Sequence, residues 1–247
     1  MLLSGRGDIS SDFIAIALLR TSSTEVKIVC MQAFFNIFCH NDVRLQLLKG
    51  DLWWSMMRLA RTDIKPVQHI GASALFQLCI AGHLYGEILR DLHIFNFIRD
   101  IISMSDEDLM GRYMLSIEYL LCEFANLQQA ELVSVLEASC HCMRYSSKKN
   151  VIAGAIRASV KCAVSFETGS EMEFVKHDII ACLEVSKSLW RDEAESVLSL
   201  AIILRYLTSF EAFSKAIRLI DLDALMLMIL KGSLDEHDLS DVEECIV

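Results

Sequence analysis

Apolar residues recur along most of this 247-residue chain with the spacing of amphipathic α-helices. The pattern is clearest in five stretches that begin 41 or 42 residues apart, namely 26–40, 67–81, 109–123, 151–165 and 193–207. In each stretch the positions i, i+4, i+7 and i+11 are mostly apolar or small, which places them on one face of a helix. The i+4 column, for example, reads Cys30, Gly71, Tyr113, Ala155 and Val197. A long helix that recurs at a near-constant period is therefore expected to dominate the chain.

Two shorter helices are predicted between successive long helices. In the first interval Gly50 interrupts the apolar pattern where a helix C-terminus commonly lies, and Asp51 is a favourable N-cap for the next helix. In the second interval Asp91 separates two apolar segments, 83–90 and 92–103. We therefore expect three helices per unit, one short and two longer.

The length of the period indicates which class of repeat protein the pattern fits. HEAT and armadillo arrays repeat every 40–47 residues or so, whereas tetratricopeptide and ankyrin arrays repeat at about 34 and 33. The stretches 30–38 and 71–79 resemble the third helix of the armadillo repeat family. This resemblance implies an all-α, right-handed α-solenoid of about five armadillo-type three-helix repeats over residues 1–232. The first repeat is expected to be incomplete, because 11–19 resemble a second helix with no first helix of normal length before it. Small side chains at Gly71 and Ala74 are expected where neighbouring third helices approach closely.

In the armadillo family the third helices line a concave groove that holds extended partner segments. Transferred repeat by repeat, the groove of this chain consists of Gln32, Asn36, Ser73, Gln77, Arg112, Leu115, Tyr119, Arg157 and Lys161. Importin-like members carry a ladder of Trp and Asn along this groove, and of the ladder residues this chain keeps only Asn36, so importin-like cargo is not expected. Arg157 and Lys161 lie four residues apart on one helix face and, with Tyr119, favour an extended acidic or aromatic–acidic partner segment. The alternative interpretation of the two cations is a solvated surface pair.

Composition is consistent with long helices in a reducing compartment. The chain is 53% hydrophobic, with one Pro and ten Gly, and it has no apolar run of the ~20 residues that a membrane span needs. Its nine cysteines are odd in number and irregularly spaced, which favours free thiols and a cytoplasmic location, compatible with cytoskeletal association. Neighbouring residues of the Cys140-His141-Cys142 cluster would point about 100° apart on a helix, so packing is predicted there rather than a metal site. No cofactor is expected.

Charge argues against nucleic acid as a partner. The net charge is −10, and six of the acidic residues lie in 233–247, where there is no Lys or Arg. We interpret 233–247 as an acidic C-terminal tail outside the solenoid. Neither part has the clustered basic stripe that DNA or RNA binding requires.

No catalytic motif is found, since the sequence has no Gly-rich phosphate loop, no HExxH and no GxSxG. The chain is therefore predicted not to be an enzyme but a scaffold that binds partner proteins through its concave groove and the solenoid ends. Two alternatives stay open. One is a structural subunit of a large assembly, for example a cytoskeletal or ciliary one, and the other is a non-catalytic regulator of an enzyme.

Overall fold

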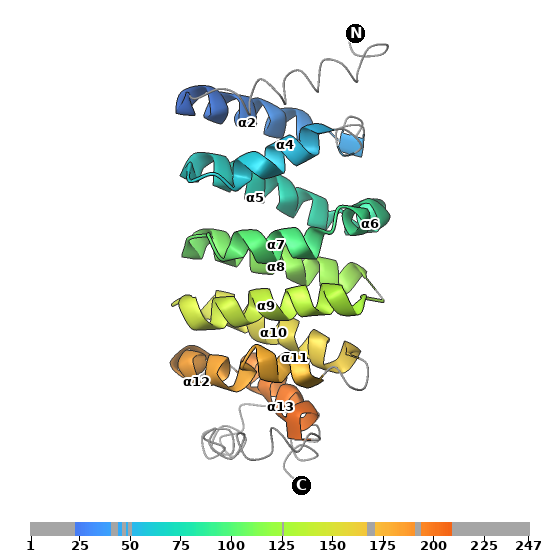
Figure 1. The fold of residues 1–247 in the computed structure, drawn as a ribbon, viewed down its shortest axis with the longest axis vertical. Coiled ribbons are helices and arrows are strands. Elements are labelled where there is room, and N and C mark those ends of the chain that lie inside the picture. Colours follow the sequence, from blue (N-terminus) through green and yellow to red (C-terminus); the bar gives the residue numbers. More distant parts are fainter. Residues whose placement is uncertain are drawn as a thin grey trace. The chain divides into compact units, whose positions relative to one another are not determined.

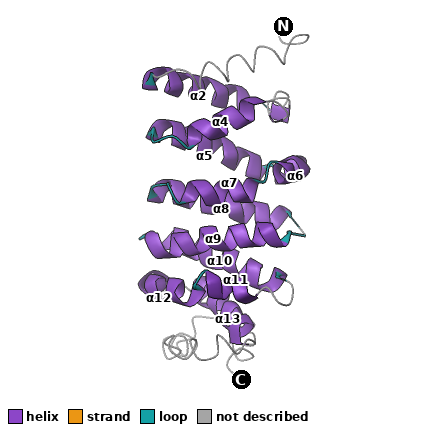
Figure 2. Cartoon of the chain, viewed as in Figure 1, coloured by secondary structure: helices purple, strands orange, loops and turns teal. Residues whose placement is uncertain are grey.

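The computed structural model describes residues 23–40, 44, 45, 48, 51–124, 126–166, 171–190 and 194–208, and all regular secondary structure in these residues is helical (Figures 1 and 2). The predicted all-α class is confirmed for this part of the chain. The segment 11–19 and the acidic tail 233–247 lie outside the described residues. The chain divides into two compact units, Met1–Leu92 and His93–Val247, and each is described by itself.

The first unit is built around one long helix, α5. Its described helices are α2 (Thr24–Phe38), α4 (Asp51–Ala60), α5 (Lys65–Ile80) and α6 (Gly82–Asp91). Ser23 caps α2 by accepting a hydrogen bond from the amide of Val26, and a proline in the first turn of α5 fits a position that needs no amide donor. Both α2 and α4 pack against α5.

The small residues of α5 allow that close packing, although the closest contact differs from the predicted one. A Cβ atom on Gly71 would lie 2.6 Å from Cβ of Ala60 on α4 and 3.8 Å from Cε of Met31 on α2. The closest approach is therefore made with the shorter helix α4, and α2, which was predicted to be the preceding third helix, comes next. Ala74, one turn further along, is completely buried.

The second unit contains two series of helices. Its described helices are α7 (Ile94–Ile102), α8 (Glu107–Glu123), α9 (Gln129–Tyr145), α10 (Lys149–Ser165), α11 (Glu171–Lys176), α12 (Ile179–Trp190) and α13 (Ala194–Thr208). The long helices α8, α10 and α13 pack on one another in succession, and so do α7, α9 and α12 (Figure 1). Helices at equivalent places in the sequence pattern are thus neighbours within this unit.

The expectation of three helices in every interval is wrong between α8 and α10. A single 17-residue helix, α9, fills most of that interval, and its sequence contains neither Gly nor Pro. In the neighbouring intervals the chain turns at His93 (φ 48°) and Asp178 (φ 51°), two residue types that tolerate the left-handed region. The position one 42-residue period after His93 is Val135, a β-branched residue that disfavours such a turn, and it lies inside α9. The helix break that was predicted at Asp91 is also displaced. Asp91 is the last residue of α6, so the chain turns after it.

The predicted inward face is correct for the later long helices and wrong for α2. Tyr113, Ala155 and Val197 of the i+4 column are buried, as is Gly71. On α2, by contrast, Val26, Ala33 and Ile37 are exposed, and the buried residues are Met31, Phe34 and Phe38. This stripe with two phenylalanines offers more apolar area than the stripe with Val26 and Ala33, so its burial stabilises the packing more.

None of the helices within the described residues is long and apolar enough to cross a membrane.

Candidate functional site

The four predicted groove residues of the first unit form a neutral polar surface. Gln32 and Asn36 are exposed, and Nε2 of Gln32 donates to Oδ1 of Asn36 at 3.2 Å, one turn along α2. Ser73 is half-buried and its hydroxyl donates to the carbonyl of His69 at 2.8 Å, while Gln77 is exposed. Each of these contacts lies within one helix. All four side chains are uncharged, so the surface that they form is neutral.

The predicted groove of the second unit carries exposed apolar side chains on adjacent helices. On α8, Leu115 is 42% exposed and Tyr119, one turn later, is 39% exposed. On α10, which packs on α8, Val164 is 63% exposed. Val164 lies one period after Cys122, which is also exposed on α8. We call Leu115, Tyr119, Cys122 and Val164 the α8–α10 face.

The cations beside the α8–α10 face differ in whether they form an ion pair. Arg157 was expected to be available to a partner, but it is paired within the chain. Its Nε donates to Oε1 of Glu118 at 2.7 Å, with the two side chains 35% and 22% exposed. The pair therefore joins α10 to α8, and a carboxylate of this chain already balances the Arg157 charge. Lys161 is half-buried and forms no ion pair with any residue that the structure describes; Arg112 is half-buried on α8.

Glu118 was not predicted as the partner of Arg157, although the repeat pattern places it close to the equivalent position on α8. The position equivalent to Arg157 in the preceding repeat is Leu115, and Glu118 lies one turn further along the same face. A Cβ atom on Gly154 would lie 3.4 Å from Oε1 of Glu118, so the missing side chain there leaves room for the carboxylate.

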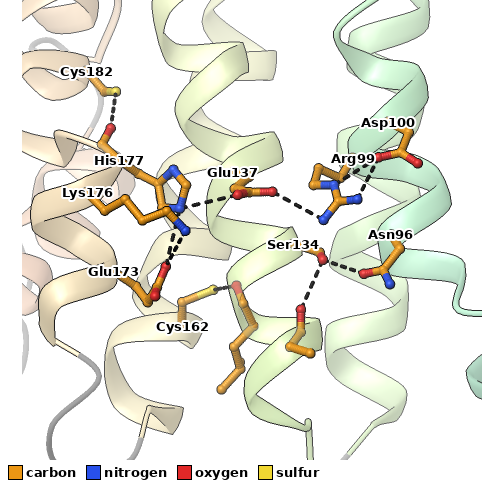
Figure 3. A network of polar contacts seen from close by, with 12 residues as sticks. Asn96, Arg99, Asp100, Ser134, Glu137, Cys162, Glu173, Lys176, His177 and Cys182 are labelled. Carbon is orange, nitrogen blue, oxygen red and sulfur yellow. Dashed lines mark hydrogen bonds and ion pairs between the residues drawn. The ribbon is translucent and has the colours of Figure 1, made fainter.

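A second polar cluster lies on α7, α9 and α11 (Figure 3). Glu137 of α9 lies between Arg99 Nη1 of α7 at 3.4 Å and His177 Nε2 at 3.4 Å. His177 Nε2 is also 3.5 Å from Oε2 of Glu173, which in turn pairs with Lys176 Nζ at 3.3 Å. Arg99 and Glu137 thus link α7 to α9, and the imidazole of His177, which is charged only when protonated, lies between the carboxylates of Glu137 and Glu173.

The Cys140-His141-Cys142 cluster lies in the packed interior of the same unit. Both cysteines are buried, and the half-buried His141 ring packs on Tyr145 with ring centres 4.6 Å apart. Burial raises the pKa of Cys142 to about 12 and lowers the pKa of His141. Over the described ranges, no group of three or more His, Cys, Asp or Glu side chains is arranged to hold a metal ion. This burial fits the predicted role of the cluster in packing.

The chain was also compared with known proteins. No protein-family model matches it, and no curated protein or solved structure shows significant similarity to it. The functional argument therefore depends on the fold and on the surfaces described above.

Proposed function

We propose that this chain is an α-solenoid of armadillo-type repeats that binds partner proteins through the solvent-facing side of its long helices. The 41–42-residue spacing and the succession α8, α10, α13 support a repeat array. Polar contacts between helices support it further, since they join residues that are nearly one period apart: Asn96 with Ser134, Glu118 with Arg157, and Asp108 with Lys148.

The α8–α10 face is the observation that carries the binding proposal. Tyr and other large side chains exposed side by side are typical of interfaces, because their burial by a partner removes apolar area from water at about 25 cal/mol per Å². Arg157 is held by Glu118, so the cation best placed for a partner carboxylate is Lys161. The partner segment that fits best therefore presents an apolar or aromatic side chain with a carboxylate nearby.

Two valines of the second unit provide a matched test of this proposal. Val164 on α10 and Val185 on α12 are 63% and 65% exposed, so a change to Ser should have nearly the same small effect on stability at both. We expect Val164→Ser combined with Tyr119→Ala to weaken partner binding by about 5- to 30-fold, in the range of interface anchors. Val185→Ser should leave it unchanged. Affinity capture from cell extract with quantitative mass spectrometry, followed by titration of each purified candidate, measures both.

Two outcomes would contradict the proposed binding face. In one, the Val164→Ser/Tyr119→Ala protein melts normally and retains the same partners with the same affinities as wild type. In the other, Val185→Ser weakens binding as much as the double variant. Lys161→Glu adds a check on partner charge, since it should weaken binding to an acidic segment most at low salt.

A structural subunit of a larger assembly is the second candidate, and the surface of α2 favours it. Val26, Val29 and Ile37 are exposed on this helix, within the residues that the structure describes. An apolar helix face of this kind is suited to a permanent interface. If this candidate is correct, Val29→Ser should disrupt co-purification and Val164→Ser should not.

A further inference from the structure

The accessible side of α10 combines cations with apolar side chains and has no acidic residue. The helix contains Lys149, Arg157 and Lys161 and neither Asp nor Glu. Val160 is half-buried beside Lys161, and Val164, one turn further along, is 63% exposed. The ion pair with α8 balances the charge of Arg157 alone. This part of the α8–α10 face is therefore apolar and positively charged at Lys161.

The α8–α10 face continues toward the end of the described chain. Cys122, Val164 and Tyr206 follow one another at intervals of 42 residues, on α8, α10 and α13, which pack on one another in that order. Tyr206 is half-buried, and α13 ends two residues later at Thr208. The chain thus leaves α13 beside the place that corresponds to Val164 in the next repeat.

The acidic tail 233–247, which lies outside the described residues, is close enough in sequence to reach this face. The 24 residues 209–232 separate it from Thr208. They would span about 36 Å as a continuous helix and more than twice that as an extended chain. Since packed helices lie 8–10 Å apart, α8 is only about 20 Å from α13. Chain length therefore permits the tail to reach both α10 and α8.

The tail has the chemistry that the α8–α10 face requires. Six of its residues are acidic and none is Lys or Arg. Leu239 and Val242 lie three residues apart, and each directly follows an aspartate, Asp238 and Asp241. The segment therefore presents apolar side chains with carboxylates next to them, which is the combination inferred above for the partner.

We propose that the acidic tail 233–247 binds the α8–α10 face of its own chain and competes there with the partner protein, an inference that rests on the proposed function of this face. The tail sets its carboxylates against Lys161 and its apolar side chains against Tyr119 and Val164. A tethered segment acts at an effective concentration of about a millimolar, so a weak contact is enough to occupy the face. The partner must then displace the tail, and its apparent affinity falls by the fraction of chains in which the face is open.

The first test is carbodiimide crosslinking of the full chain, which joins a lysine amine to a carboxylate in contact with it. We expect amide links between Lys161 and residues of 233–247, at a yield about threefold or more above that for links from Lys149 to the same segment. Lys149 is the matched control, because it lies on the same helix about 18 Å away and is more exposed than Lys161. The yield at Lys161 should fall about threefold between 0.1 M and 1 M salt, since the Debye length shrinks from about 10 to 3 Å.

Two further measurements test the apolar contact and the origin of the links. Val164→Ser should lower the yield at Lys161, whereas Val185→Ser on α12 should not. In a mixture of isotope-labelled and unlabelled chains, the links should join residues of the same chain. Mass spectrometry of the digested monomer measures all of these yields.

The second test is competition with the partner. Asp238→Asn combined with Asp241→Asn should abolish most links at Lys161 and raise the affinity for the partner about three- to tenfold, because more chains have an open face. Asp63→Asn combined with Asp91→Asn is the control, since it makes the same change of charge at two exposed residues of the first unit.

The crosslinking needs no partner, so it separates a failure of tail binding from a failure of the proposed partner face. The inference is overturned if Lys161 is linked to the tail no more than Lys149, or if the links join different chains. It is also overturned if the two double Asn variants have the same links and the same partner affinity.

Discussion

At the scale of single residues, the buried hydroxyl of Tyr113 lowers the stability of the fold. Its side chain is 1% exposed inside the second unit, and its hydroxyl has no hydrogen-bond partner among the described residues. Burial accordingly raises the pKa of this phenol. A buried polar group without a partner loses its hydration, at a cost of about 1–3 kcal/mol.

Replacement of this hydroxyl should therefore stabilise the protein. We expect Tyr113→Phe to raise the free energy of unfolding by about 1–3 kcal/mol, since it keeps the ring and removes the unpaired group. Tyr145→Phe is the control, because that residue is exposed and its hydroxyl stays in water, and no change is expected there. Urea denaturation followed by circular dichroism measures both. A loss of stability in Tyr113→Phe would mean that a buried water satisfies the hydroxyl.

At the scale of elements, contacts between helices decide which glycines are required. Gly71 of α5 and Gly154 of α10 are both interior helix positions, where Ala is normally favoured by about 1 kcal/mol. At Gly71 a new Cβ would meet Cβ of Ala60 at 2.6 Å, an atom fixed directly to the α4 backbone. At Gly154 the nearest atom is a terminal oxygen of the Glu118 side chain at 3.4 Å.

The two glycines should consequently respond differently to the same change. Gly71→Ala should lower the free energy of unfolding, because separating α4 from α5 costs about 1–3 kcal/mol and outweighs the gain in helix propensity. Gly154→Ala should leave stability unchanged or raise it by up to about 1 kcal/mol. Chemical denaturation of the two variants beside wild type provides the comparison. Equal effects would show that the α4–α5 contact is looser than described.

At the scale of the whole molecule, the division into two units predicts how a local change spreads. Leu75 of α5 and Ile156 of α10 are both completely buried, one in each unit. Because α5 packs on α2 and α4, and α10 packs on α8, α9 and α13, we expect destabilisation to remain concentrated near the changed site.

Leu75→Ala and Ile156→Ala should therefore loosen different parts of the chain. Each should cost about 2–5 kcal/mol as a core truncation. Hydrogen–deuterium exchange should accelerate mainly in α2, α4 and α5 for Leu75→Ala, and mainly in α8, α9 and α10 for Ile156→Ala. If both variants accelerate exchange to the same extent throughout, the described part of the chain unfolds as one cooperative body.

Much of the secondary structure could be predicted because hydrophobic periodicity is a local property. The long helix predicted at 109–123 is α8 (Glu107–Glu123), and the one predicted at 151–165 is α10 (Lys149–Ser165). The exposure of Leu115 and Tyr119 on the candidate face followed from the same columns. The continuous α9 was missed because the prediction extended two intervals to a third, although 129–145 lacks the residues that would break a helix.

The sequence by itself determined the helical class, the period and the faces of the later long helices, because these depend on the order of side chains along one helix. The tertiary structure decided which residues meet across helices. Glu118 balances Arg157 only because α8 and α10 pack against each other in a particular register, which the spacing along the sequence does not fix. The buried face of α2 is a similar case, since two apolar stripes competed there and packing on α5 selected the more aromatic one. Local pattern supplies the candidate faces, and the free energy of packing chooses among them.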